Sequence, residues 1–247
     1  METIYKKTFY VRNFDVDCNG KLKLEMLLNF LQESAAEHAD KLGVSGKELL
    51  KKNLAWVLSR YHIKITRYPS QGEAIEIVTW PSIIKGIFTL REFEIFSHNT
   101  KTAEATSSWL AVDLNKKKPI NINKSLPEFP MHDKRAVNDD FQRLPDFEKT
   151  DFELRFPVLK GNLDFNHHVN NVVYINLAVE TIPKKVIMNF RPSRIEVNYK
   201  NETFYSDWII SRSQNIDTGK YPQFIHQLVR ESDGQEIARL RTAWADL

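Results

Sequence analysis

The chain has 247 residues, of which 42% are hydrophobic and 27% are charged, so it can bury a sizeable core and is too apolar for a disordered chain. Its net charge of +3 does not argue for nucleic-acid binding, and its 8 glycines disfavour Gly-rich phosphate loops. The single cysteine, Cys18, excludes an internal disulfide, and no apolar run suits a membrane span or a signal peptide, which together predict a cytoplasmic protein.

The first half of the chain predicts a strand, a helix and then further strands. A strand is expected over residues 4–12 and a turn at Asp17-Cys18-Asn19-Gly20. Apolar residues from Leu24 to Leu42 then recur at the spacing of a helix face, and a further helical segment is expected over 44–53. Alternation of apolar and polar side chains predicts four strands, over residues 59–66, 73–81, 86–97 and 102–114.

The second half repeats this order after a proline-containing segment, 115–150, that is expected to be a linker. A strand over 152–156 precedes a second turn that begins at Asp164, and an apolar helix is expected over 169–179. Strands are expected over residues 193–200, 205–213, 222–231 and 235–246. The repeat predicts two α+β domains, 1–114 and 151–247, in each of which an antiparallel sheet wraps around one helix; chance similarity is the alternative.

Asp164, Asn166 and His168 stand at alternate positions immediately before the second predicted helix. On an extended segment alternate side chains point the same way, so an acid, an amide and an imidazole can converge. The alternative is that Asp164 and Asn166 only form a turn and cap the helix. The first copy has Lys21 where the second has His168, and capping leaves this difference unexplained. The pattern therefore favours one active site in the second copy.

The start of the second predicted helix offers a further element of such a site. Free backbone N–H groups and the positive end of the helix dipole stabilise a developing oxyanion. The N–H groups of Val169 and Asn170 are the expected donors. This chemistry is typical of acyl transfer.

The segment from Asp164 to Asn171, followed by Tyr174, resembles the signature of the acyl-acyl carrier protein thioesterases of plants and bacteria, which are built from two hotdog folds in tandem. The resemblance covers essentially the whole chain. It implies hydrolysis of acyl carrier protein thioesters to free fatty acid, with no metal and no cofactor. It also implies functional roles for Asp164, Asn166 and His168 and, because the segment Tyr199-Lys200-Asn201-Glu202-Thr203 matches the family's next strand, for Glu202.

In the plant enzymes a cysteine follows this glutamate, whereas the present chain has Thr203, which excludes a cysteine nucleophile at that position. We therefore expect attack by water, with Glu202 taking the proton directly or through His168. Asn166 would orient the water or the thioester, and Asp164 would hold Asn166 or His168. A covalent intermediate on Glu202 is the alternative. His167 is expected to face away from the site, and Cys18 to be a buried, inert thiol.

An acidic carrier protein predicts a basic docking face. Residues 41–68 are strongly basic with Glu48 as their only acid, and residues 184–201 are also basic; the candidate docking residues are Lys47, Lys51, Lys52, Lys184 and Lys185. The linker lysines 116–118 are interpreted as solvated surface. A homodimer is compatible with this interpretation.

The resemblance also implies an acyl-chain pocket between the helix and the sheet of the first copy. The candidate lining residues are Leu27, Leu31, Trp56, Leu58 and Trp80, and ordinary core packing is the alternative for each. Two other functions stay open, a hotdog acyl-CoA thioesterase and a non-catalytic module that senses acyl groups or binds the carrier.

Overall fold

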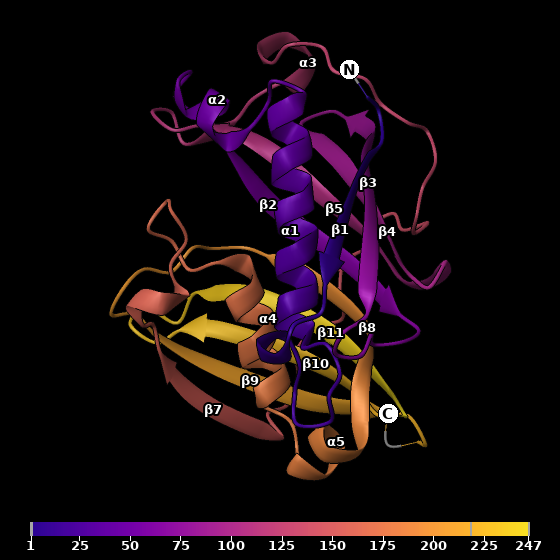
Figure 1. The fold of residues 1–247 in the computed structure, drawn as a ribbon. Coiled ribbons are helices and arrows are strands. Elements are labelled where there is room, and N and C mark those ends of the chain that lie inside the picture. Colours follow the sequence, from indigo (N-terminus) through magenta and orange to yellow (C-terminus); the bar gives the residue numbers. More distant parts are fainter. Residues whose placement is uncertain (1, 218, 247) are drawn as a thin grey trace. The chain divides into compact units, whose positions relative to one another are not determined.

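A computed structural model describes residues 2–217 and 219–246 of the chain, so Met1, Thr218 and Leu247 lie outside the described part. The chain divides into two compact units, Met1–Asp140 and Phe141–Leu247, called here the first and second units. Figure 1 shows the elements of each unit in sequence colours. Within the described residues, no helix is long and apolar enough to cross a membrane.

The first unit is an antiparallel sheet with one long helix. Its strands follow the order β1-β3-β4-β5-β2, with β6 paired to β5. The elements are β1 (Tyr5–Tyr10), the 3-10 turn η1 (Asn13–Asp15), α1 (Leu24–Lys41), α2 (Gly46–Leu50), β2 (Leu54–Ile65), β3 (Ala74–Lys85), β4 (Phe88–Ser97), β5 (Thr100–Asp113), β6 (Lys118–Pro119) and α3 (Ile122–Ser125).

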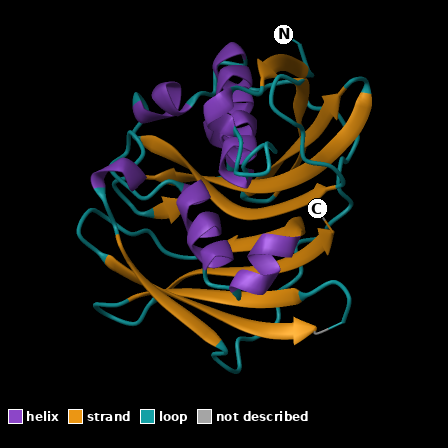
Figure 2. Ribbon diagram, turned by 60° about the horizontal axis from the view of Figure 1, so that its bottom comes forward, coloured by secondary structure: helices purple, strands orange, loops and turns teal. Residues whose placement is uncertain are grey.

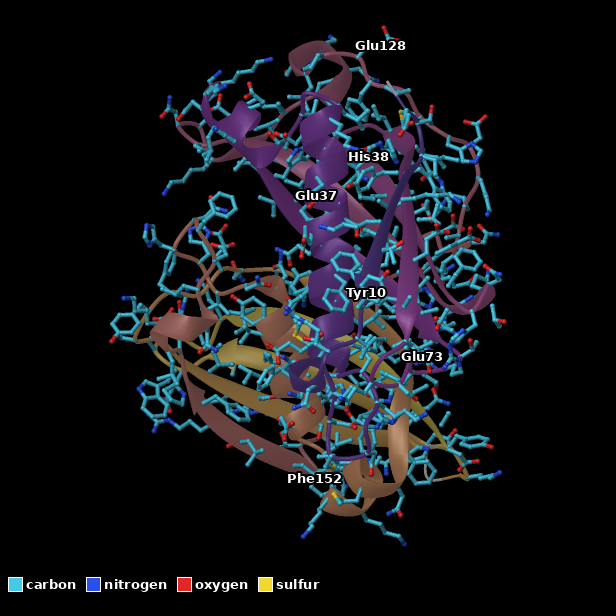
Figure 3. All side chains as sticks on the ribbon, in the orientation of Figure 1. Tyr10, Glu37, His38, Glu73, Glu128 and Phe152 are labelled. Carbon is cyan, nitrogen blue, oxygen red and sulfur yellow. The ribbon has the colours of Figure 1, made fainter. Side chains whose placement is uncertain are left out.

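Helix α1 packs on the sheet through the apolar face that its sequence spacing predicts, and Figure 2 shows it lying across the strands. Leu27, Leu28 and Leu31 are buried on this face. The helix ends before Gly43, whose φ of +71° suits a glycine after a helix C-terminus. His38 is also buried on α1 (Figure 3). Burial lowers the pKa of His38 to about 4, so it is neutral near pH 7.

The second unit repeats this arrangement with a shorter helix. Its strands follow the order β8-β11-β10-β9-β7, which is the order of the first unit when β7 is matched to β1. The elements are β7 (Phe152–Pro157), η2 (Lys160–Asn162), α4 (Asn171–Glu180), α5 (Lys184–Asn189), β8 (Phe190–Tyr199), β9 (Trp208–Asp217), β10 (Gln223–Arg230) and β11 (Glu236–Asp246). Of the residues of α4, only Glu180 is exposed, as the apolar sequence of this helix predicts.

The predicted α+β class, with a hotdog arrangement of one helix and one antiparallel sheet in each copy, is confirmed. Some local features differ from the sequence prediction. Helix α5 was not expected, β2 starts at Leu54 rather than near residue 59, and β9 starts at Trp208 rather than at 205.

The segment 115–150, expected to be a linker, is mostly exposed but is anchored on the first unit by a few buried side chains. Its residues up to Asp140 belong to the first unit. Ile122, Leu126 and Phe129 are buried in a core cluster that also contains Leu49 and Leu54. This cluster is built from apolar residues without a helix or strand period, so the sequence pattern could not reveal it.

Residues 131–139, called the strap, are held on the first unit by a buried ion pair. The carboxylate of Glu92 on β4 is fully buried and accepts hydrogen bonds from Arg135 Nε at 2.8 Å and from the backbone N–H of Ala136 at 3.0 Å. The hydroxyl of Ser82 and that of Thr106 donate to the same carboxylate. Two of these donors, Arg135 and Ala136, belong to the strap. The same hydrogen bonds therefore satisfy the buried carboxylate of Glu92 and hold the strap on β4.

His226 on β10 is a fully buried histidine of the second unit. Its Nε2 lies 2.8 Å from Thr242 Oγ1, and its Nδ1 has no hydrogen-bond partner in the described part of the chain. Burial lowers the pKa of His226 to about 3 from the ordinary value of 6.5.

The unfolded chain therefore binds a proton at His226 before the folded one does, and stability falls as the pH drops from about 6.5 towards 3. We expect His226 to contribute a slope of up to about 1.4 kcal/mol per pH unit to the free energy of unfolding of the second unit. Urea unfolding at several pH values measures this slope. His226→Asn should reduce this slope by about one proton, and an equal slope in the original protein and the variant would contradict the prediction.

Candidate active site

The turn before α4 is built by the side chain of Asp164. Its Oδ1 accepts the backbone N–H of Asn166 at 2.8 Å and that of His168 at 3.3 Å. In the first unit Asp17 Oδ1 accepts the N–H groups of Asn19 and Lys21 in the same way, at 2.9 and 3.2 Å. The two copies thus share one turn, and Asp164 has the turn-forming role that the alternative interpretation gave it.

His167 occupies a left-handed position in this turn, with φ of +63°, and its side chain is exposed. The matching position in the first unit is Gly20, with φ of +69°. A glycine adopts this conformation without a steric penalty, which explains its use there. His167 therefore takes the place in this turn that Gly20 takes in the first unit.

His168 and Glu202 come together although they are far apart in sequence. His168 Nδ1 lies 3.5 Å from Glu202 Oε1, and the two side chains are 35% and 54% exposed, so both reach solvent. The rings of Phe204 and His168 are nearly perpendicular, with their centroids 5.1 Å apart. Asn166 is exposed, and the described contacts include none made by its side chain. An imidazole beside an accessible carboxylate is suited to moving a proton from water.

The loop that carries Glu202 is held from several sides. Val169 N donates to Thr203 O at 3.0 Å, which joins the loop to the Asp164 turn. Arg230 Nη1 donates to the backbone carbonyl of Glu202 at 3.0 Å, and Asn201 Nδ2 donates to Glu236 O at 2.8 Å. These bonds fix the backbone of Glu202 while leaving its carboxylate free to face His168.

Thr203 and Tyr174 form a buried contact behind this pair. The Tyr174 and Thr203 hydroxyls are 2.8 Å apart, and the N–H of Thr203 donates to Tyr174 Oη at 3.2 Å. Burial raises the pKa of Tyr174 to about 12, so its phenol stays neutral. Thr203 is fully buried, which leaves its hydroxyl no access to a substrate. The sequence drew attention to Tyr174 only as part of a motif, and gave it no role.

The prediction that the backbone N–H groups of Val169 and Asn170 are free to bind an oxyanion is wrong. Val169 N is bound to Thr203 O, and Asn170 N donates to Asn162 O at 2.9 Å. The side chain of Asn170 caps α4 by accepting the N–H of Val172. Both predicted N–H groups are thus already bonded within the protein, because they hold the turn and the Glu202 loop together.

Comparison with known protein families shows to which family this chain belongs. The acyl-ACP thioesterase N-terminal domain matches residues 2–128, and the acyl-ACP thioesterase C-terminal domain matches residues 146–246. The chain belongs to the acyl-ACP thioesterase family.

Individual relatives support this assignment. The chain is 30% identical over 269 residues to a chloroplastic palmitoyl-acyl carrier protein thioesterase of Gossypium hirsutum, an alignment that covers 98% of this chain and 63% of that relative's length. Two solved structures share the fold. They are an acyl-ACP thioesterase from Bacteroides thetaiotaomicron (TM-score 0.87, 24% identity, 98% of each chain covered) and a 12:0-ACP thioesterase from Umbellularia californica (TM-score 0.88, 21% identity, 100% and 99% covered).

In this acyl-ACP thioesterase family member, the residues predicted to line an acyl-chain pocket are mostly core residues of the first unit. Leu27, Leu31, Leu58 and Trp80 are buried. Trp56 is half-buried, packs against the cluster of Leu49 and Leu54, and donates from Nε1 to Val44 O at 2.8 Å. These contacts fit the alternative of core packing and leave contact with an acyl chain as a prediction.

The candidate docking lysines of this family member are all exposed. The excess positive charge of residues 41–68 is smaller in the folded chain than in the sequence, because two of its basic side chains form ion pairs. Arg67 pairs with Glu73 at 2.9 Å and Lys64 with Glu104 at 3.8 Å, both acids outside the segment.

Cys18 is exposed in the first turn, so the expectation of a buried thiol is wrong. No group of His, Cys, Asp and Glu side chains suited to a metal occurs among the residues described.

We expect Tyr174→Phe to lower kcat by about tenfold with little change in KM, because the Glu202 loop loses its buried hydroxyl contact and the hydroxyl of Thr203 loses a partner. Steady-state kinetics measure both constants. Tyr199→Phe is the matched control, since its hydroxyl donates instead to Asn171 O. Equal losses in the two variants would show that Tyr174 has no special part in placing Glu202.

Proposed function

We propose that this protein hydrolyses the thioester of an acyl-acyl carrier protein and releases a free fatty acid. The observation that carries the proposal is the accessible His168–Glu202 pair beside the start of α4, in a chain of this family. Among the described residues, the matching position of the first unit does not carry such a pair. There Lys21 replaces His168, and the bond from Leu22 N to Pro69 O, which matches that from Val169 N to Thr203 O, puts the buried Tyr68 at the position of Glu202.

The proposed reaction needs no covalent intermediate. Glu202, directly or through His168, takes a proton from water as the water oxygen attacks the thioester carbon. The carbon–sulfur bond of the resulting tetrahedral species then breaks, and the proton passes to the departing thiolate of the carrier's prosthetic arm. The side-chain amide of Asn166 is the proposed group that orients the water or the thioester, and Asp164 supports both by forming the turn.

This reaction is tested with purified protein and a panel of acyl chains, each offered on acyl carrier protein and on coenzyme A. The proposal expects free fatty acid from the carrier substrates, with a kcat/KM well above that for the matching coenzyme A thioesters. A preference for coenzyme A would assign the protein to the alternative acyl-CoA thioesterases. Binding of acyl carrier without release would assign it to the non-catalytic alternative.

We propose that the carrier docks near Lys184 and Lys185, which are exposed at the start of α5 in the unit that holds the catalytic pair. Reversal of both charges to glutamate should raise KM for an acyl carrier substrate by about fivefold at low salt, and the difference should shrink in 0.5 M salt as screening increases. Reversal of Lys6 and Lys160 changes the net charge equally and is the control. An unchanged KM in the Lys184/Lys185 variant would remove α5 from the docking surface.

An acyl-chain pocket in the first unit is proposed on the resemblance alone, and a cytoplasmic location and a homodimer stay predictions. Lys47, Lys51 and Lys52 belong to the first unit, and their surroundings are described next.

A further inference from the structure

One end of the first unit's sheet gathers lysines from three loops. At this end β2 begins, β5 ends and the β3–β4 hairpin turns, and Figure 1 shows α2 beside the start of β2. Leu114 N donates to Asn53 O at 3.0 Å, which joins the loop after α2 to the turn after β5. The exposed lysines of these segments form what we call the lysine end, and they are Lys47, Lys51, Lys52, Lys85, Lys116, Lys117 and Lys118.

These lysines have few acidic neighbours. The three segments, residues 46–53, 83–88 and 113–119, contain only two acids, Glu48 and Asp113. Glu48 pairs with Lys51 at 2.6 Å, and Asp113 uses one oxygen to accept backbone N–H groups of its own turn while its other oxygen lies 3.7 Å from Lys116. Among the described contacts the remaining five lysines have no carboxylate partner. The lysine end therefore presents an excess of positive charge.

Large aliphatic side chains stand between the lysines. Leu50 and Leu114 are 44% and 42% exposed, and Ile83 and Ile87 in the β3–β4 hairpin are each 36% exposed. They come from all three segments, so no single loop conformation accounts for their exposure. By contrast, their neighbour Leu49 is buried in the core cluster. Exposed aliphatic residues grouped with lysines at one end of a sheet mark a candidate interaction surface.

The composition of the lysine end favours a lipid surface over a protein partner. Protein interfaces are enriched in arginine, tyrosine and tryptophan and depleted in lysine. The three segments contain seven lysines and none of those three residue types. Lysine is a flexible point charge that needs no fixed geometry, which suits mobile lipid phosphates, while aliphatic side chains at loop tips can enter the interfacial region.

We propose that the lysine end binds the surface of a membrane that contains anionic lipids, with the lysines over the phosphates and Leu50, Leu114, Ile83 and Ile87 in the interfacial layer. The association is peripheral and reversible, since a few aliphatic side chains and a cluster of charges give modest affinity. It goes beyond the proposed hydrolysis, which involves the second unit.

Sedimentation with vesicles tests this proposal without any substrate. The full-length protein should bind vesicles of phosphatidylcholine with 30% phosphatidylglycerol, should bind pure phosphatidylcholine at least about tenfold more weakly, and should dissociate in 0.5 M salt. Lys117→Glu with Lys118→Glu should weaken binding about tenfold or more. Leu50→Ser with Leu114→Ser should weaken it as well, and this loss should persist at all salt concentrations. The control variant, Lys6→Glu with Lys160→Glu, should bind within about twofold of the original protein.

Three results would overturn the proposal. The first is no binding to the anionic vesicles. The second is an equal loss of binding in the Lys117/Lys118 and control variants, which would show attraction by overall charge. The third is unchanged vesicle binding by the Lys117/Lys118 variant together with a raised KM for acyl carrier substrate, which would make the lysine end a protein-docking surface. Circular dichroism confirms folding of each variant, and vesicle binding is read independently of fatty-acid release.

Discussion

Replacing His168 with alanine, or Glu202 with glutamine, is expected to lower kcat/KM for acyl carrier hydrolysis by at least about 100-fold, the usual contribution of a general acid–base group. The pair is separated by only 3.5 Å and no other imidazole–carboxylate pair is described in the second unit, so nothing nearby can replace either group. The rate of free fatty acid release at substrate concentrations well below KM measures the effect directly. The double variant should lose little more than the worse single variant, because the two groups act as a unit.

The neighbouring His167 provides the control for this experiment. His167→Gly should keep kcat/KM within about threefold, because glycine adopts the left-handed conformation at least as easily as histidine. If both the His168 and the Glu202 variants retained activity within tenfold of the original enzyme, the assigned active site would be wrong. Single-turnover hydrolysis in ¹⁸O-water tests for a covalent intermediate, since water attack on the Glu202 carbonyl carbon of an acyl–Glu202 anhydride would leave label in the Glu202 carboxylate.

Removing the Arg135 side chain is expected to lower the free energy of unfolding of the first unit by about 3–5 kcal/mol, the usual effect of leaving one partner of a buried ion pair alone. Arg135 Nε lies 2.8 Å from a Glu92 oxygen that is fully buried, so Arg135→Ala leaves that carboxylate in the core without its cation. Hydrogen exchange measured by mass spectrometry on peptides of β4 and of residues 131–139 resolves the loss to this unit.

Arg143→Ala is the matched control for the strap, because Arg143 and Asp146 form an ion pair that is 81% and 64% exposed. Such a pair should contribute less than about 1 kcal/mol. Replacing both Glu92 and Arg135 with methionine should recover part of the stability lost in Arg135→Ala, since no uncompensated charge remains. Exchange of the β4 peptides at the original rate in Arg135→Ala would show that the strap does not stabilise the first unit.

The sequence was most informative where a period or a motif repeats. The apolar spacing from Leu24 onward predicts α1, and the recurrence of the Asp17 turn at Asp164 predicts the second copy. The juxtaposition of His168 with Glu202 followed from family resemblance, because no local pattern connects residues so far apart.

Features that depend on tertiary contacts were missed. Glu92 lies in a strand, and the apolar–polar alternation of that strand gives no sign that Arg135 approaches it. The sequence therefore predicts a linker where the structure has the strap. The N–H groups of Val169 and Asn170 looked free because a sequence shows where a helix starts and not which carbonyl lies opposite. Asp164 was assigned to support a side chain, whereas its oxygen is used by the backbone of its own turn.

The exposed Cys18 gives the chain a practical property. It is the only cysteine in the sequence, and it lies in the first-unit turn that has the same hydrogen bonds as the Asp164 turn. A maleimide dye or spin label therefore attaches at one defined position without any substitution, while the matching position in the second turn is Phe165, which does not react. The natural protein is therefore already a single-site reporter, in which spectroscopy can follow the first unit alone.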